Sequence, residues 1–282
     1  MKAWIVLTFL SAAVYAQQPS IVPGGVLNAA SFAKNADGTG APVAPGSLVA
    51  IFGSGLGASQ ADADSVPFST SLGGVTVMFN NVQAPMRDVI PAAGIVNVEV
   101  PFAAMQAGQG SATVNVTVTF NNQSASTNVT LVPAAPGVFT LPSGAGAAIL
   151  VNLTDGTIAA PAPNVPGFSS LASHPIPRGT QAFFYATGLG AMTPPVNDGD
   201  GGSSCPPSGC VVNVNPIVWI GGVNTGVMVP VEFAGQAPGF PGVYQVNIQI
   251  PSNAPTGDNI DLQLTSVDGR QVSPAAAKIS IQ

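Results

Sequence analysis

Two stretches of the chain match each other and decide the fold: residues 45–57 (PGSLVAIFGSGLG) and residues 178–190 (RGTQAFFYATGLG). Each begins with a turn, continues as an apolar run of strand length and ends on Gly-Leu-Gly. We interpret the glycines as a bend that takes the strand away from its sheet and returns the leucine to the core. A phosphate-binding loop would need a helix directly after the glycines, and neither copy predicts one.

Three further pairs of segments match in the same order along the chain. They are residues 77–82 with 218–223, residues 97–101 with 247–251, and the turns at 121–122 and 268–269. Matches that keep their order while their spacing drifts indicate two copies of one domain with different loops.

Between these motifs, apolar and polar residues alternate with a period of two. Residues 114–120 (VNVTVTF) and 244–250 (YQVNIQI) are clear examples, and only residues 102–107 could form a helical turn. Such alternation is typical of strands with one buried face. The sequence therefore predicts an all-β fold. A single large barrel is the alternative, but it would leave the duplicated motifs unexplained.

We expect two tandem immunoglobulin-like antiparallel β-sandwiches, the first over residues 21–140 and the second over residues 141–282. A hairpin over residues 147–158, turning at Asp155-Gly156, is expected at the start of the second domain.

The first sixteen residues have the features of a secretory signal peptide. Lys2 precedes an apolar run over residues 3–13, and Val14-Tyr15-Ala16 fits a small-residue cleavage site. The run is shorter than the roughly 20 residues that a membrane-spanning helix needs. We expect cleavage after Ala16 and an exported protein, secreted to the outside or the periplasm, without membrane insertion.

Charge is scarce in this chain. It has six Lys and Arg, twelve Asp and Glu, and a net charge of −6, while 46% of its residues are hydrophobic. Disordered chains have the opposite composition, so a folded protein is expected. The few basic residues argue against nucleic acid as a partner. With one histidine and two glutamates, an enzyme is the least favoured class, and we expect no cofactor.

Cys205 and Cys210 are the only cysteines. In an exported protein they predict a local disulfide. A redox motif would have two intervening residues rather than four, and zinc would need four ligands.

The segment 197–203 (NDGDGGS) has the composition of a calcium loop. An EF-hand that starts at Asp198 would need a glutamate at Gly209, so the segment is not an EF-hand. A weak, irregular calcium site built on Asp198 and Asp200 is one interpretation, and a solvated polar loop is the other.

The same loop is the largest difference between the two copies. Residues 191–216 are about ten residues longer than residues 58–72 and carry the cysteine pair. Loops on a shared scaffold often carry function. We therefore hypothesise that residues 197–210 contact a partner, through Asn197, Asp198, Asp200 and Ser203. Protection of a long loop from proteases is the alternative.

The other acid–base residues do not form a catalytic set. His174 is expected in the linker before the second domain, and no nucleophile elbow is present. Glu99 should point outward from a first-domain strand, while Glu232 lies in the second domain. A glycosidase pair would bring the two carboxylates to within about 5–10 Å, which we do not expect.

Several segments together carry a family resemblance. They include residues 24–32 (GGVLNAASF), 44–53 (APGSLVAIFG), 135–140 (APGVFT) and 238–247 (PGFPGVYQVN). On these motifs the chain resembles the Solibacter-type uncharacterised C-terminal domain family of exported bacterial proteins. Its halves are similar to IPT/TIG immunoglobulin-like domains. The resemblance implies an exported bacterial β-sandwich protein and implies no catalytic residues.

These observations favour a non-catalytic structural or interaction module, in cell-surface adhesion or assembly, with a protein or glycan partner. The alternative is a carbohydrate-binding module, which would need exposed aromatic side chains. Trp219, Tyr185 and Tyr244 are the candidates, but Trp219 and Tyr244 lie in strand patterns that look core-facing.

Overall fold

The computed structural model describes residues 18–282, and the predicted signal peptide lies outside them. Within this part of the chain the fold is all-β, which confirms the predicted fold class. Its only helical segments are two single 3-10 turns, η1 (Pro91–Ala93) and η2 (Phe102–Ala104).

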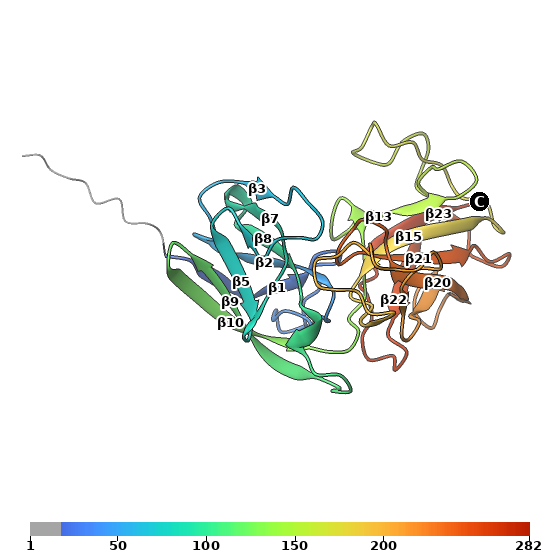
Figure 1. Cartoon of the computed structure of the whole chain (residues 1–282). Coiled ribbons are helices and arrows are strands. Elements are labelled where there is room, and N and C mark those ends of the chain that lie inside the picture. Colours follow the sequence, from blue (N-terminus) through green and yellow to red (C-terminus); the bar gives the residue numbers. More distant parts are fainter. Residues whose placement is uncertain (1–17) are drawn as a thin grey trace, which may run out of the picture.

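Strands from the first half of the chain form two antiparallel sheets, on the left of Figure 1. One sheet has the order β1 (Ser20–Asn28), β2 (Leu48–Ser54), β8 (Ile95–Glu99), β7 (Met86–Ile90), β3 (Ala61–Asp62). The other has the order β10 (Gln123–Leu131), β9 (Ala112–Phe120), β5 (Val75–Phe79), β4 (Ser71–Leu72), with β6 (Val82–Gln83) beside β5. Alternate valines of β8 and β9 share one buried core, so the two sheets form a sandwich.

The second half also forms two sheets around its own core. One has the order β11 (Gly137–Val138), β15 (Gln181–Thr187), β21 (Tyr244–Gln249), β20 (Val231–Gln236), β17 (Val211–Val212), β16 (Met192–Thr193), with β14 (Leu150–Asn152) beside β15. The other has the order β12 (Thr140–Leu141), β13 (Gly146–Ala148), β23 (Ala277–Ile281), β22 (Gly257–Thr265), β18 (Ile217–Ile220), β19 (Val227–Val229). All pairs are antiparallel except β13 with β23.

The matching sequence motifs lie on strands that hold the same place in their sheets. β2 pairs with β8 in the first half, and β15 pairs with β21 in the second. In the facing sheets β5 pairs with β9, and β18 pairs with β22. The pairing of β11 with β15 puts residues 137–138 in the second half. The change from one half to the other therefore falls within residues 132–136, slightly before the predicted boundary.

The segment predicted as a hairpin over residues 147–158 divides between two sheets. β13 pairs with β12 and β23, whereas β14 pairs with β15. The turn at Asp155-Gly156 does form, and an isolated bridge joins Val151 to Ile158. The hairpin is therefore shorter than predicted, because the chain crosses between sheets at Ile149.

Both Gly-Leu-Gly motifs form bends as predicted. Gly55 and Gly188 have positive φ, and the leucines that follow are almost completely buried in their respective cores. The bend of the second half has an additional neighbour, since the Ala135 N–H donates to the Gly188 carbonyl at 2.8 Å. This bend therefore holds the segment that links the two sandwiches.

Candidate functional site

The two sandwiches contact each other along an interface that we call the seam. In one part of the seam the loop 197–200 meets the first sandwich. The Phe102 N–H donates to Asp198 Oδ1 at 2.8 Å, and the Gly199 N–H donates to Glu99 Oε2 at 2.7 Å. The Phe68 N–H donates to the Gly199 carbonyl at 2.9 Å. Two residues of this loop thus bind three sites on the first sandwich.

A second set of contacts crosses the seam near β2. The Leu48 N–H donates to Thr187 Oγ1 at 2.9 Å, and the Thr187 hydroxyl donates to the Gly242 carbonyl at 2.6 Å. Thr187 is completely buried. Because an unmade hydrogen bond of a buried group costs about 1–3 kcal/mol, these contacts favour one fixed arrangement of the sandwiches.

Glu99 lies inside the seam rather than on an open surface. Its residue exposure is 2%, whereas the strand pattern predicted an outward side chain. The side chain does leave the first core, but the second sandwich covers it. Burial raises the pKa of Glu99 to about 8, and the nearby Asp198 and Asp200 add to the rise, against the hydrogen bond from Gly199.

Asp198 and Asp200 serve the loop and the seam. Burial raises the pKa of Asp198. Asp200 is 4% exposed and accepts hydrogen bonds from the Ser203 N–H and from the hydroxyls of Ser203 and Ser204. Burial favours a higher pKa for Asp200, but these hydrogen bonds outweigh burial and lower the pKa. Over residues 18–282, no three His, Cys, Asp or Glu side chains gather as a metal site would require.

The disulfide between Cys205 and Cys210 is present, with a Cα–Cα distance of 5.2 Å, and this prediction is confirmed. The residues of the hypothesised partner loop divide into two groups. Asp198 and Asp200 are taken up by contacts within the chain, while Asn197 and Ser203 remain exposed. The contact that the loop makes in this structure is with the first sandwich.

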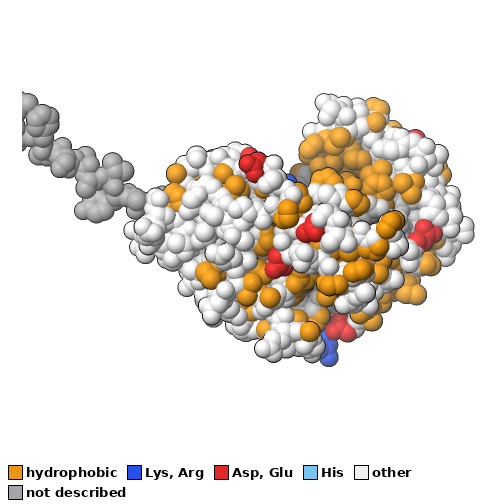
Figure 2. Space-filling view, in the orientation of Figure 1, with side chains coloured by type: hydrophobic (Ala, Val, Ile, Leu, Met, Phe, Trp, Pro, Cys, Tyr) orange, Lys and Arg blue, Asp and Glu red, His pale blue; other side chains and the backbone are white. Residues whose placement is uncertain are grey.

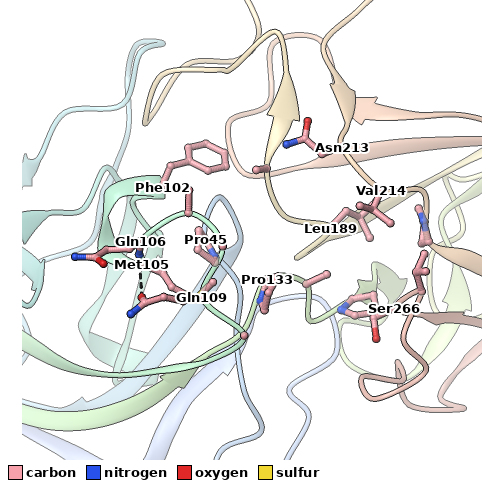
Figure 3. A pocket seen from close by; sticks show the side chains of 18 of the residues that line it. Pro45, Phe102, Met105, Gln106, Gln109, Pro133, Leu189, Asn213, Val214 and Ser266 are labelled. Atoms are coloured by element: carbon pink, nitrogen blue, oxygen red, sulfur yellow. Dashed lines mark hydrogen bonds between the residues drawn. The ribbon is translucent and has the colours of Figure 1, made fainter.

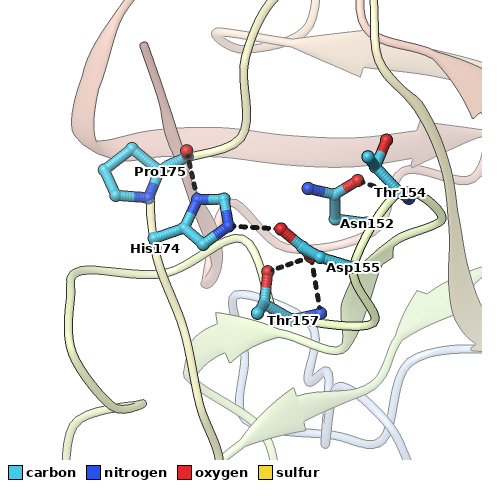
Figure 4. A network of polar contacts seen from close by, with 6 residues as sticks. All are labelled: Asn152, Thr154, Asp155, Thr157, His174 and Pro175. Atoms are coloured by element: carbon cyan, nitrogen blue, oxygen red, sulfur yellow. Dashed lines mark hydrogen bonds and ion pairs between the residues drawn. The ribbon is translucent and has the colours of Figure 1, made fainter.

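His174 forms a pair with Asp155 that the sequence reasoning missed (Figure 4). Its Nε2 lies 2.7 Å from Asp155 Oδ2, and its Nδ1 lies 2.8 Å from the Pro175 carbonyl. Both partners only accept, so the arrangement is fully satisfied when both ring nitrogens carry a proton. The hydrogen bond to Asp155 raises the pKa of His174, and the Thr157 N–H, followed by His174, lowers the pKa of Asp155 to about 2.

The pair joins residues 19 positions apart at the base of the loop 158–173. No local motif predicts such a contact, and the only sequence signal was the Asp-Gly turn. A general base needs a free ring nitrogen facing its nucleophile. Because both nitrogens of His174 are engaged, the pair fastens the loop instead.

A groove of about 830 Å³ opens between the sandwiches (Figure 3). Pro45, Phe102 and Met105 line it from the first sandwich, and Leu189 and Val214 line it from the second. Val214 is 59% exposed. Amide side chains around the groove are Gln106, Gln109, Asn213 and Asn215. The groove is thus apolar with a neutral polar rim, and the second sandwich completes it.

The three aromatic candidates occupy different environments. Tyr244 is fully buried and donates its hydroxyl to the Gly190 carbonyl at 2.7 Å, and burial, with Glu99 nearby, raises its pKa. Trp219 was expected to face the core, but it alternates with the buried Val218 and Ile220 and lies on the outer face of β18. Tyr185 lies on the outer face of β15 and contacts Phe240.

Comparison of this chain with protein-family models and with curated proteins finds no match. Among residues 18–282, no helix has the length and apolar character that crossing a bilayer requires. The disulfide is a feature typical of proteins that fold in oxidising compartments.

Proposed function

We propose that this protein is an exported, non-catalytic interaction module whose two β-sandwiches work as one rigid unit in cell-surface adhesion or assembly. The observation that carries the proposal is the seam. The loop 197–200 donates and accepts hydrogen bonds across it, and Glu99 is buried beneath the loop. Rigid positioning of two domains suits a protein that presents a surface spanning both of them.

The state of the acid–base residues supports a non-catalytic role. Glu99 is buried against a backbone N–H, and both nitrogens of His174 are engaged. Glu232 accepts a hydrogen bond from Gln181 on the exposed face of the second sandwich. Charged side chains are few and scattered on the face shown in Figure 2. Clustered, perturbed titratable groups mark many active sites. Glu99, Asp198, Asp200 and Tyr244 do form such a cluster, but each is hydrogen-bonded within the fold.

Export is supported by the disulfide and by the resemblance to the Solibacter-type family. Intact-mass measurement of secreted protein tests it. We expect a mature chain that starts at Gln17 and contains oxidised Cys205 and Cys210. A different start, or two free thiols, would contradict the proposal.

The interaction role is tested by affinity capture from the envelope of the producing cell. Gly199→Val should weaken saturable capture, because Gly199 has φ +77° and an added Cβ would lie 3.0 Å from the Phe68 carbonyl oxygen. Gly269→Val is the matched control, since Gly269 also has positive φ but an added Cβ meets nothing within 4 Å. Equal capture by the wild type, Gly199→Val and Gly269→Val would show that the seam does not serve the interaction.

A carbohydrate-binding module is the second candidate. The observation that favours it is the contact between Tyr185 and Phe240, whose ring centroids are 6.3 Å apart on the outer surface at the seam.

A further inference from the structure

A second pocket, of about 340 Å³, opens in the seam and shares no lining residue with the groove of Figure 3. Its first wall is the outer face of β2, β8 and β7, and its second wall comes from β15 and the turn before β21. Ligand pockets commonly have volumes of about 300–1,000 Å³. The size and the position between two domains are therefore those of a binding site for a small ligand or one end of a longer one.

Aromatic rings dominate this pocket. Its lining includes Phe32, Phe139, Tyr185 and Phe240. Neighbouring rings pack edge-on against two of them. The ring centroids of Phe183 and Tyr185 are 5.4 Å apart, and those of Phe52 and Phe32 are 5.8 Å apart. Phe240 is 56% exposed. Exposed aromatic surface that lines a concave pocket is available for contact with a ligand.

Polar side chains stand beside the rings. The Arg87 guanidinium lies 2.5 Å from Asp88 Oδ2, and the Asn97 amide donates to Asp88 Oδ1 at 2.6 Å. Asp88 therefore orients both residues. The Arg87 side chain is 52% exposed and lines the pocket, so it is available to a ligand.

The pocket adjoins a smaller depression of about 220 Å³. The two hollows share Arg87, Phe240 and Val243, and the second adds Asp62 and Asp88. The continuous surface thus has an aromatic half and an acidic half, with Arg87 at their junction.

We propose that this surface binds a neutral oligosaccharide, with one sugar ring in the aromatic pocket and the next in the acidic depression. A pyranose ring has an apolar C–H face, which packs on aromatic side chains. Its hydroxyls donate to carboxylates and accept from guanidinium and amide groups. Asp62 and Asp88 disfavour an anionic ligand, and Arg87 disfavours a cationic one.

The assignment rests on the second candidate function, the carbohydrate-binding module, and names its site and ligand class. It also explains why the ring surface needs both sandwiches: Arg87 and Asn97 come from the first, while Tyr185 and Phe240 come from the second. Between 88 and 153 positions separate the two sets of residues in the sequence, and no local motif joins them.

The test is calorimetric titration with a panel of neutral trisaccharides: cellotriose, maltotriose, mannotriose and N-acetylchitotriose. We expect saturable binding of at least one, and a loss of about tenfold or more in affinity for Phe240→Ala. Met228→Ala is the matched control, because Met228 is 60% exposed on β19 and lines neither hollow. Tyr185→Phe keeps the ring and should retain most of the affinity.

Failure to bind any member of the panel would overturn the sugar assignment, and so would equal affinity of wild type and Phe240→Ala. Preference for a sulfated oligosaccharide or a peptide over all neutral sugars would overturn it as well. Envelope capture by Phe240→Ala separates the two proposals. Capture that survives without sugar binding leaves the interaction module standing and removes only this site.

Discussion

The loops that follow the two Gly-Leu-Gly bends differ in what they contact. In the first sandwich, residues 58–72 contain β3, which pairs with β7 of the same sheet. In the second, residues 191–216 contain the corresponding edge strands, but Asp198 and Gly199 cross to the first sandwich. The comparison teaches that the extra length of the second loop builds the contact between domains. A difference between repeats can thus reflect domain assembly as well as an external partner.

The two bends also differ in their contacts with the linker, residues 132–136. An added Cβ on Gly188 would lie 2.1 Å from the Ala135 carbonyl oxygen, and one on Gly190 would lie 2.2 Å from that of Pro133. In the first sandwich, an added Cβ on Gly57 would meet the Val89 side chain of its own domain. The second bend therefore holds the linker, and the first serves only its own core.

The largest predicted effect is the pH dependence of the seam. The pKa of Glu99 is raised from 4.5 to about 8, so the unfolded chain releases this proton first as pH rises. Stability should then fall between these pH values, by up to about 1.4 kcal/mol per pH unit and no more than about 5 kcal/mol in all. Asp198, Asp200 and Tyr244 face the same carboxyl. Urea unfolding at several pH values measures the slope.

Glu99→Gln is the control for this slope. The amide keeps an oxygen for the Gly199 N–H and cannot ionise, so the fall in stability over this pH range should largely disappear. An unchanged slope in the variant would assign the effect to another group.

The second effect concerns the linker. Gly188→Ala should lower the free energy of unfolding by about 3 kcal/mol, because it combines strain at φ +80° with a clash against the linker. Gly156→Ala has a similar φ of +76° and nothing within 4 Å of an added Cβ, so it should lose only about 1 kcal/mol. Equal losses in chemical denaturation would show that the linker contact is dispensable.

The third effect sharpens the comparison of the two loops, since only the second carries a disulfide. Replacing both Cys205 and Cys210 by alanine should cost about 2 kcal/mol on the chain-entropy account of a short closed loop. Limited proteolysis should then cut within residues 203–209. The seam should persist, because Asp198 and Gly199 lie outside the closed loop. Loss of the pH dependence due to Glu99 in this variant would contradict that separation.

The smallest effect is at the His174–Asp155 pair, which belongs to the second half alone. The pKa of His174 is raised, so its contribution is full below pH 6.5 and is lost as pH rises through the raised value. The pKa of Asp155 is lowered to about 2, so its contribution is lost only as pH falls from 3.8 toward 2. Protection of the Thr157 N–H from hydrogen exchange, corrected for intrinsic rate, should follow this window. His174→Gln should remove the alkaline limb, and protection independent of pH would contradict the assignment.

The strands could be predicted from the sequence because local alternation encodes them. Val114, Val116 and Val118 are buried on one face of β9, and the turn residues Asn121 and Asn122 have positive φ, as a tight hairpin requires. The disulfide was also predictable, because the two cysteines lie close in the sequence.

The seam could not be predicted in this way. Glu99 and Gly199 are a hundred residues apart, and the alternation that puts Glu99 outside the first core says nothing of a second domain that covers it. Trp219 shows the same limit. An apolar residue in a strand indicates the core, but here it lies on the outer face beside Met228 of β19. Tertiary context decided both positions.

The central claim is that the loop 197–200 and the linker hold the two sandwiches as one rigid body. Residual dipolar couplings of backbone amides in solution test it most directly. We predict that one alignment tensor fits the couplings of β9 and β10 in the first sandwich together with those of β21 and β22 in the second. Two tensors that differ in magnitude or orientation would show that the sandwiches move independently, and would contradict the claim.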